Sequence, residues 1–250
     1  MNDRTGSPRL AATVSGIVAS IVAMTIAAGA MSAAPGGLAK AMAAGSASVL
    51  VADKGKLKIL VNGQPAATEE FEIHPDGDHW IAQGAVEVKP AQGPASRVHA
   101  HLTLQPDGTP VNYQWKTEGA KKASASIAFQ NSIATIELQL ENAKPFTQQF
   151  TFTSPQIAVL DNNVYHQYAI LAHLYDGTKK GVQTFSVLVP QEMVPGSVTV
   201  ESLGSSSSSG AALEELRVKS ADLEVDVFMD PKGRLMRILV PSANAEIVRE

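Results

Sequence analysis

Apolar and polar residues alternate along most of the chain from residue 55 onward. Alternation with a period of two is typical of β-strands with one buried face, because successive side chains point to opposite sides of a strand. Turn sequences separate the stripes, as at Pro75-Asp76-Gly77-Asp78 and Pro106-Asp107-Gly108-Thr109. A four-residue loop at 75–78 would place Ile73 opposite Trp80. The sequence therefore predicts a long run of antiparallel strands. The clearest stripes are Leu57, Ile59 and Val61; Phe71 and Ile73; Trp80, Ala82, Gly84, Val86 and Val88; Val98, Ala100, Leu102 and Leu104; and Leu223, Val225, Val227 and Met229.

The pattern changes once, near residue 160. Between residues 161 and 176 the apolar side chains recur at helical spacing, with Asp161 or Asn162 suited to cap the start and Gly177 to end it. Strand signals then return, and the Ser-rich segment 204–212 is interpreted as a loop between two of them. A single amphipathic helix among many strands is best buried across a curved sheet. We therefore predict a mainly β fold, a large curved antiparallel sheet (a half-barrel) covered by one amphipathic helix.

The N-terminal segment predicts export. Arg4 and Arg9 precede an uncharged apolar run, and A-x-A pairs follow, which is the pattern of a secretory signal peptide. The alternative is an uncleaved anchor, since the run is long enough to cross a bilayer. Residues 1–33 are therefore a signal peptide or membrane anchor, 34–52 an Ala/Gly/Ser linker, and 53–250 the β domain. Either alternative predicts an extracytoplasmic domain, periplasmic or secreted, with membrane contact only through residues 10–34.

Composition narrows the chemistry. The chain has no cysteine, which excludes disulfides, thiolate zinc sites and cysteine nucleophiles. Its net charge is −4, and removing residues 1–52, with three basic side chains and one acidic, makes the β domain more acidic still. Such a domain lacks the cationic surface that phosphate backbones attract, so we expect no nucleic-acid partner.

The strand run 55–153, the sequence Leu160-Asp161-Asn162-Asn163 and the closing turn Asp230-Pro231-Lys232-Gly233-Arg234 resemble the LolA-like half-barrel superfamily of periplasmic lipoprotein carriers and its uncharacterised envelope relatives. In those carriers a concave sheet, partly covered by helices, holds acyl chains. The resemblance is one of architecture. It implies an apolar or lipid ligand between sheet and helix.

The histidines offer the only spacing that suits a metal. His99 and His101 point to one side of a strand, and the expected pairing of Val88 with Val98 places Glu87 beside His99. On the other side the expected register places Lys116 beside His99 and Gln114 beside His101. The ammonium of Lys116 favours the alternative, a solvated polar face. His166 and His173 share a helix face and are expected at the surface or at a groove edge. No catalytic motif is present, so we expect no catalytic residue, metal or cofactor, and the sequence favours a protein that is not an enzyme.

Aromatic residues on the apolar face are the best candidates for a ligand site. In the same register Gly84 lies beside Leu102 and leaves a space that a ring or a ligand fills. The alternative is a core in which the helix packs directly on the sheet. The sequence thus predicts an exported protein that binds or carries an apolar ligand, or else a non-enzymatic structural or interaction module of the cell envelope. The candidate ligand-binding residues are Trp80, Gly84, Leu102, Tyr113, Trp115 and Tyr168.

Overall fold

The computed structural model describes residues 48–88, 95–119, 122–208 and 211–250. These form one open sheet of 15 strands in the order β8-β7-β6-β5-β4-β3-β2-β1-β15-β14-β13-β12-β11-β10-β9, which confirms the predicted fold class. Neighbouring strands are antiparallel, except that β9 and β10 are parallel. The strands are β1 (Asp53–Val61), β2 (Gln64–Asp76), β3 (His79–Val88), β4 (Ser96–Leu104), β5 (Pro110–Glu118), β6 (Ala123–Gln130), β7 (Ile133–Leu140), β8 (Phe146–Thr151), β9 (Ile157–Val159), β10 (Gln183–Val189), β11 (Val194–Ser208), β12 (Ala211–Lys219), β13 (Glu224–Met229), β14 (Leu235–Val240) and β15 (Ala245–Arg249).

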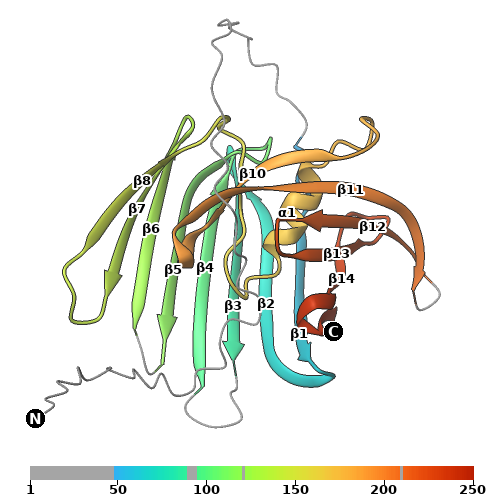
Figure 1. The fold of residues 1–250 in the computed structure, drawn as a ribbon, viewed down its shortest axis with the longest axis horizontal. Coiled ribbons are helices and arrows are strands. Elements are labelled where there is room, and N and C mark those ends of the chain that lie inside the picture. The colour runs from blue at the N-terminus through green and yellow to red at the C-terminus, as the bar shows by residue number, and fades with distance from the viewer. Residues whose placement is uncertain (1–47, 89–94, 120–121, 209–210) are drawn as a thin grey trace, which may run out of the picture.

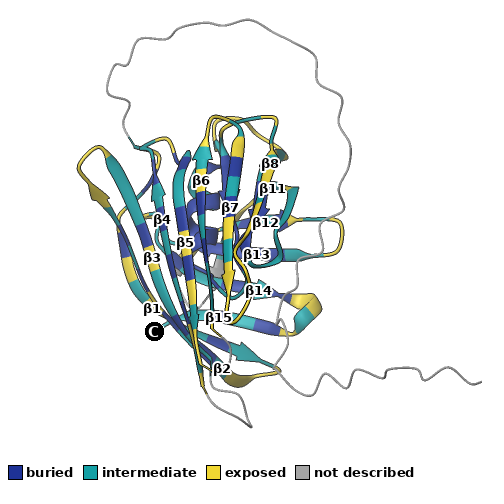
Figure 2. Cartoon of the chain, turned by 90° about the vertical axis from the view of Figure 1, so that its left-hand side faces the viewer, coloured by how far each residue is buried: buried dark blue, intermediate teal, exposed yellow. Residues whose placement is uncertain are grey.

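The sheet curves back over itself, so that its two halves face each other. Strands β10–β13 run across β2–β5 at a steep angle, and α1 lies beside them (Figure 1). The halves join where β1 pairs with β15. Their facing sides supply the buried core, and the polar sides point outward (Figure 2). The largest fully buried side chains come from both halves: Tyr113, Leu57, Ile59, Ile73, Leu102, Leu104, Ile127, Ile136, Ile157, Leu171, Leu188 and Leu235.

The one α-helix within the described residues is shorter than the sequence predicted. Helix α1 spans Gln167–Leu174, whereas the helical pattern covered residues 161–176. Residues 161–166 form turns instead, and Asp161 does not cap the helix, whose N-cap is His166. The carboxylate of Asp161 accepts hydrogen bonds from the backbone N–H groups of Asn162 and Gln191, at 3.0 Å each. The hydrogen bond from Gln191 is a tertiary contact, and it outweighs the local preference for helix.

Two predicted pairings differ from the observed register by two residues. The turn after β2 consists of Gly77 and Asp78, so Asp76 pairs with His79 and Ile73 with Ala82, not with Trp80. Likewise Val98 pairs with Val86, not with Val88. A slip of two residues leaves every side chain on its predicted face, so periodicity cannot detect it. The pairings of His99 with Lys116 and of His101 with Gln114 are confirmed.

The Ser-rich segment and the N-terminal segments have different outcomes. The predicted Ser-rich loop 204–212 is largely strand, because β11 continues to Ser208 and β12 begins at Ala211. The predicted signal peptide or anchor, 1–33, lies outside the described residues, as does most of the linker 34–52. Leu50, at the end of that linker, is buried in the core. No helix in the described ranges is long and apolar enough to span a bilayer.

Candidate functional site

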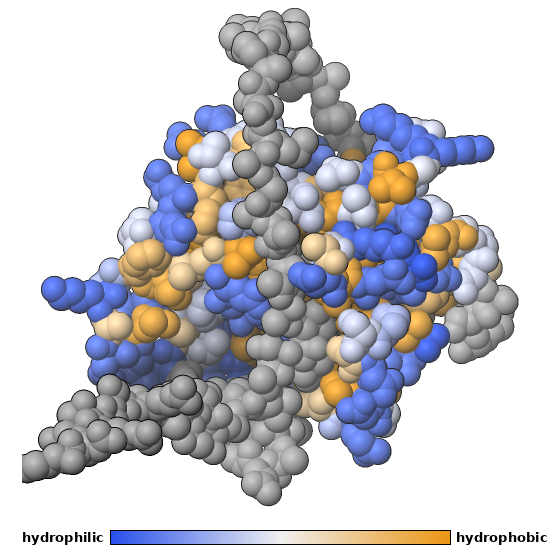
Figure 3. Space-filling view, in the orientation of Figure 1, coloured by the Kyte–Doolittle hydropathy of each residue, from blue (hydrophilic) through white to orange (hydrophobic). Residues whose placement is uncertain are grey.

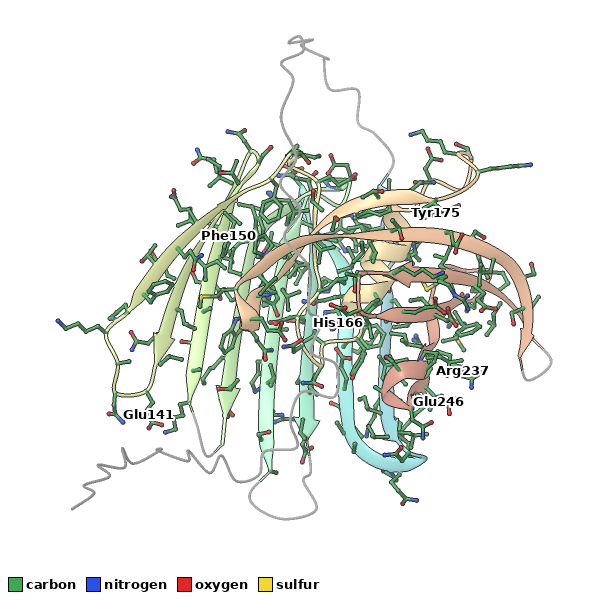
Figure 4. All side chains as sticks on the ribbon, in the orientation of Figure 1. Glu141, Phe150, His166, Tyr175, Arg237 and Glu246 are labelled. Atoms are coloured by element: carbon green, nitrogen blue, oxygen red, sulfur yellow. The ribbon has the colours of Figure 1, made fainter. Side chains whose placement is uncertain are left out.

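A buried pair of polar side chains lies at the centre of the molecule. Glu69 of β2 and His166, just before α1, are fully buried, and Nδ1 of His166 donates to Oε1 of Glu69 at 2.5 Å. Figure 4 labels His166 in the middle of the molecule. The backbone N–H of Tyr165 donates to the other carboxylate oxygen at 2.8 Å. The imidazole also stacks on Phe71, with ring centroids 5.7 Å apart and planes within 4°. The carboxylate therefore fixes the segment before α1 onto the sheet. The sequence analysis placed His166 at the surface or a groove edge, and that prediction was wrong.

A second buried carboxylate holds the same segment from the other side. Tyr113 of β5 donates its hydroxyl hydrogen to Oδ2 of Asp161 at 2.7 Å. The backbone N–H of Asp161 donates to Oε1 of Gln167 at 2.6 Å. Burial raises the pKa of Asp161 to about 6, against the hydrogen bonds that lower it. Burial, followed by the charge of Asp161, raises the pKa of Tyr113 well above its usual range. Both carboxylates thus serve to position a loop.

The space beside Gly84 is filled by a ring of the protein itself. A Cβ at position 84 would lie 2.8 Å from Cε1 and Nδ1 of His166. Gly84 pairs with Ala100, and Ala100 with Trp115, so the row that the sequence placed beside Leu102 is shifted. Leu102, Tyr113, Trp115 and Tyr168 are buried in the core, and Trp80 packs half-buried against it. The structure thus gathers the candidate residues on one face, and a ligand among them stays a prediction.

The outer face of the same strands carries a groove that the sequence analysis did not find. It has a volume of about 840 Å³ and is lined by residues of β2–β7 together with Lys54 and Pro145. The lining residues form three rows across the strands, each member paired with the next on the neighbouring strand. Two rows point outward, and they are Glu72, Gln83, His101, Gln114, Ser126 and Glu137, and Glu70, Ala85, His99, Lys116, Ser124 and Gln139. The row between them, whose side chains belong to the core face, is Phe71, Gly84, Ala100, Trp115, Ala125 and Leu138.

The rows give the groove a regular set of hydrogen-bonding groups. Neighbouring strands are about 4.8 Å apart, so a row of six residues is about 24 Å long. Amide, imidazole, hydroxyl and carboxylate groups alternate along it, and small side chains such as Ala85 and Ser126 leave the floor open. The groove is therefore suited to an extended polar ligand that lies across the strands.

The structure does not bring together the zinc ligands that the histidine spacing allowed. Ala85, not Glu87, pairs with His99, and Glu87 pairs with Arg97. The imidazole of His99 lies 3.8 Å from the carboxylate of Glu118, and both side chains are largely solvated. No group of three or more metal-ligating side chains occurs in the ranges that the structure describes. His99 and His101 are part of the groove lining instead.

The fold defines the chain as an open, barrel-like β domain, and comparison with known proteins finds the same architecture. No protein-family model and no curated protein matches the chain. A β-barrel-like protein of domain of unknown function DUF1849 from Brucella abortus is similar, with a TM-score of 0.56 over 82% of this chain and 97% of that one, at 8% identity. A DUF1089 family protein from Pseudomonas aeruginosa has a TM-score of 0.42 at 8% identity, over 68% of this chain and 88% of that one. The likeness to the Brucella protein concerns the fold alone, and the resemblance to LolA-like carriers is not confirmed.

Proposed function

We propose that the chain is an exported, non-enzymatic binding protein of the cell envelope, and that its ligand lies in the groove across β2–β7. The observation that carries the proposal is the pair of in-register polar rows lining that groove of about 840 Å³. Binding sites are concave and hold a few well-placed polar groups, and this volume is within their usual range. The groove is better supported than the space between sheet and helix, because His166 fills that space beside Gly84.

The ligand we propose is polar. Carboxylates and lysines of both signs line the groove together with glutamines, serines and histidines. Such side chains discriminate between ligands by hydrogen bonds. The apolar or lipid ligand that the sequence suggested remains the alternative, and it would need the interior to open.

Native mass spectrometry of protein purified from its own cells tests the site. We expect a bound polar molecule in the wild type and its loss in Ser126→Trp, because the indole fills the floor of the groove. Thr103→Trp is the matched control, since Thr103 points to the same outer face but outside the groove. Wild-type protein without a bound molecule would refute the proposal. A bound lipid that survives Ser126→Trp would favour the interior site.

The export part of the proposal has its own test. Arg4 and Arg9 precede residues 10–39, which carry no charge, and this is the pattern of an export signal. We expect N-terminal sequencing of the protein from the envelope fraction to show a mature chain that begins after Ala30, Ala33 or Ala43. An intact N-terminus in that fraction would mean an anchor, and recovery from the cytoplasm would contradict export.

A further inference from the structure

Strand β8 ends the sheet and leaves one edge open. It pairs with β7, and within the described ranges no strand lies on its other side. Figure 2 looks onto this end of the sheet, where most of β8 is exposed. Proteins protect such edges with charged residues, proline or bulges. The segment Phe146–Phe152 has none of these. The edge is therefore ready to pair with another strand.

The hydrogen-bond pattern identifies which backbone groups point outward. The N–H of Phe152 donates to the carbonyl of Ser132 at 2.7 Å, so this pair of residues is a hydrogen-bonded one. Hydrogen-bonded and non-hydrogen-bonded pairs alternate along an antiparallel ladder. In the observed register the even residues of β8 consequently bond to β7. The N–H and C=O groups of Thr147, Gln149 and Thr151 point to the open edge.

We propose that β8 pairs antiparallel with β8 of a second copy of this chain, about a two-fold axis at Gln149. Antiparallel pairing requires the outward-pointing backbone groups of one copy to lie opposite those of the other. A two-fold axis at Gln149 places all three such residues of each copy opposite one another. Gln149 then lies opposite Gln149 of the second copy, and Thr147 opposite Thr151. Each of the three pairs exchanges two backbone hydrogen bonds.

The side chains of both faces match in the same register. On the outer face the order Thr-Gln-Thr reads the same from either end, which aligns threonine with threonine. On the inner face Phe146 lies opposite Phe152, and Gln148 opposite Phe150. Threonine pairs and aromatic pairs are among the cross-strand pairs that stabilise sheets. A self-complementary strand favours a second copy over a foreign peptide, and a two-fold pair closes without forming a filament.

Exposed apolar side chains at this end add to the interface. Phe146 is 48% exposed, Leu140 45% and Ile133 40%, all on β7 or β8. Apolar side chains reach the surface over this end of the sheet, on the left in Figure 3. Pairing of β8 extends the sheet across the two-fold axis and covers Phe146 with Phe152 of the second copy.

Disulfide trapping tests the axis, because the chain has no cysteine of its own. In full-length protein held in a mild detergent, Gln149→Cys is expected to form a disulfide-linked dimer on mild oxidation. The two Cα atoms would be about 5.5 Å apart, within the range that a disulfide bridges. Thr147→Cys is the control, since its two copies would lie about 14 Å apart. Equal cross-linking of the two variants would overturn the proposal.

A charge exchange separates this interface from any other. Gln149→Lys and Gln149→Glu each place like charges face to face at the axis, so each is expected to raise the dimer dissociation constant by about tenfold or more. An equimolar mixture of the two is expected to restore the dimer in sedimentation analysis. Protein that is monomeric at all concentrations, or a dimer that Gln149→Lys leaves unchanged, would refute the two-fold pairing.

Discussion

At the scale of single residues, the unusual feature is a set of ionisable groups inside an apolar core. Burying a carboxylate is costly unless donors surround it. Glu69 has three, from the ring of His166 and the backbone N–H groups of Tyr165 and His166. Asp161 likewise accepts from Tyr113, Asn162 and Gln191. Each carboxylate is thereby committed to holding the chain around residues 161–167 in one conformation.

Gly84 is required by the position of His166. In Gly84→Ala the added Cβ would lie 2.8 Å from two ring atoms that are fully buried and bound to Glu69. We expect a loss of about 1–3 kcal/mol in the free energy of unfolding, measured by urea denaturation. Gly177→Ala is the control, because its Cβ would meet nothing within 4 Å. A change in Gly84→Ala no larger than in the control would mean that the ring moves freely.

Asp161 makes stability depend on pH. Burial raises its pKa from 3.8 to about 6, so the folded state binds this proton more tightly than the unfolded state does. The resulting stability is complete below about pH 4 and is lost as the pH rises through about 6, with a total of about 3 kcal/mol. In Asp161→Asn this loss is expected to vanish. Urea unfolding of both proteins at intervals from pH 4 to pH 7 measures it, and parallel curves would contradict the assignment.

At the scale of elements, the segment leading into α1 depends on β2 more than on helix propensity. The helix has only eight residues, and no side chain caps its start. The carboxylate of Glu69 takes up the N–H groups of Tyr165 and His166, just before its first residue. This explains why a sequence pattern extending from residue 161 yields a helix only from residue 167.

Removing that carboxylate is expected to release the segment. Glu69→Ala leaves a buried imidazole and two backbone donors without their acceptor, which costs about 3–5 kcal/mol. Hydrogen exchange at Tyr165 and His166 is expected to accelerate more than exchange in β4 and β5. Glu70→Ala is the neighbouring control, since Glu70 is exposed and its contact with Lys56, at 3.8 Å, is solvated. A change below about 1 kcal/mol in Glu69→Ala would show that the pair is not required.

Sequence patterns predict which segments form strands, and which face each side chain occupies, better than they predict how the strands pair. Alternation assigns the face of each side chain, and Ala82, Val86 and Leu102 are indeed buried. It does not set the register, because a slip of two residues preserves every face. The buried pair of Glu69 and His166 has one signal in the sequence. Glu70 and Glu72 point outward, and successive residues of a strand point to opposite faces. Glu69, next to Glu70, must therefore point inward, which places a charged residue on an apolar face. Its partner His166 is 97 residues away and could be found only from the fold.

At the scale of the whole molecule, the junction where β15 joins β1 to β14, here called the seam, determines whether the two halves act as a unit. Strand β15 pairs with β1 of the first half and β14 of the second. Arg249 of β15 binds both oxygens of Asp53, at 2.7 and 3.1 Å, and donates to the carbonyl of Leu235. Asp53 is almost fully buried and also accepts from the N–H of Leu235. The first and last strands of the described domain and β14 therefore meet at a single guanidinium.

Arg249→Ala is expected to destabilise both halves together. It leaves the carboxylate of Asp53 buried with its main donor gone, at a cost of about 3–5 kcal/mol, and Arg249→Lys restores only part of this because the bidentate geometry is lost. Both tryptophans, Trp80 and Trp115, lie in the first half, so their fluorescence reports that half while circular dichroism reports all strands. Lys54→Ala, which removes an exposed ion pair with Glu72, serves as the control. Coincident urea transitions shifted to lower concentration would establish the seam, whereas a fluorescence transition left at its wild-type midpoint would show that the halves fold independently.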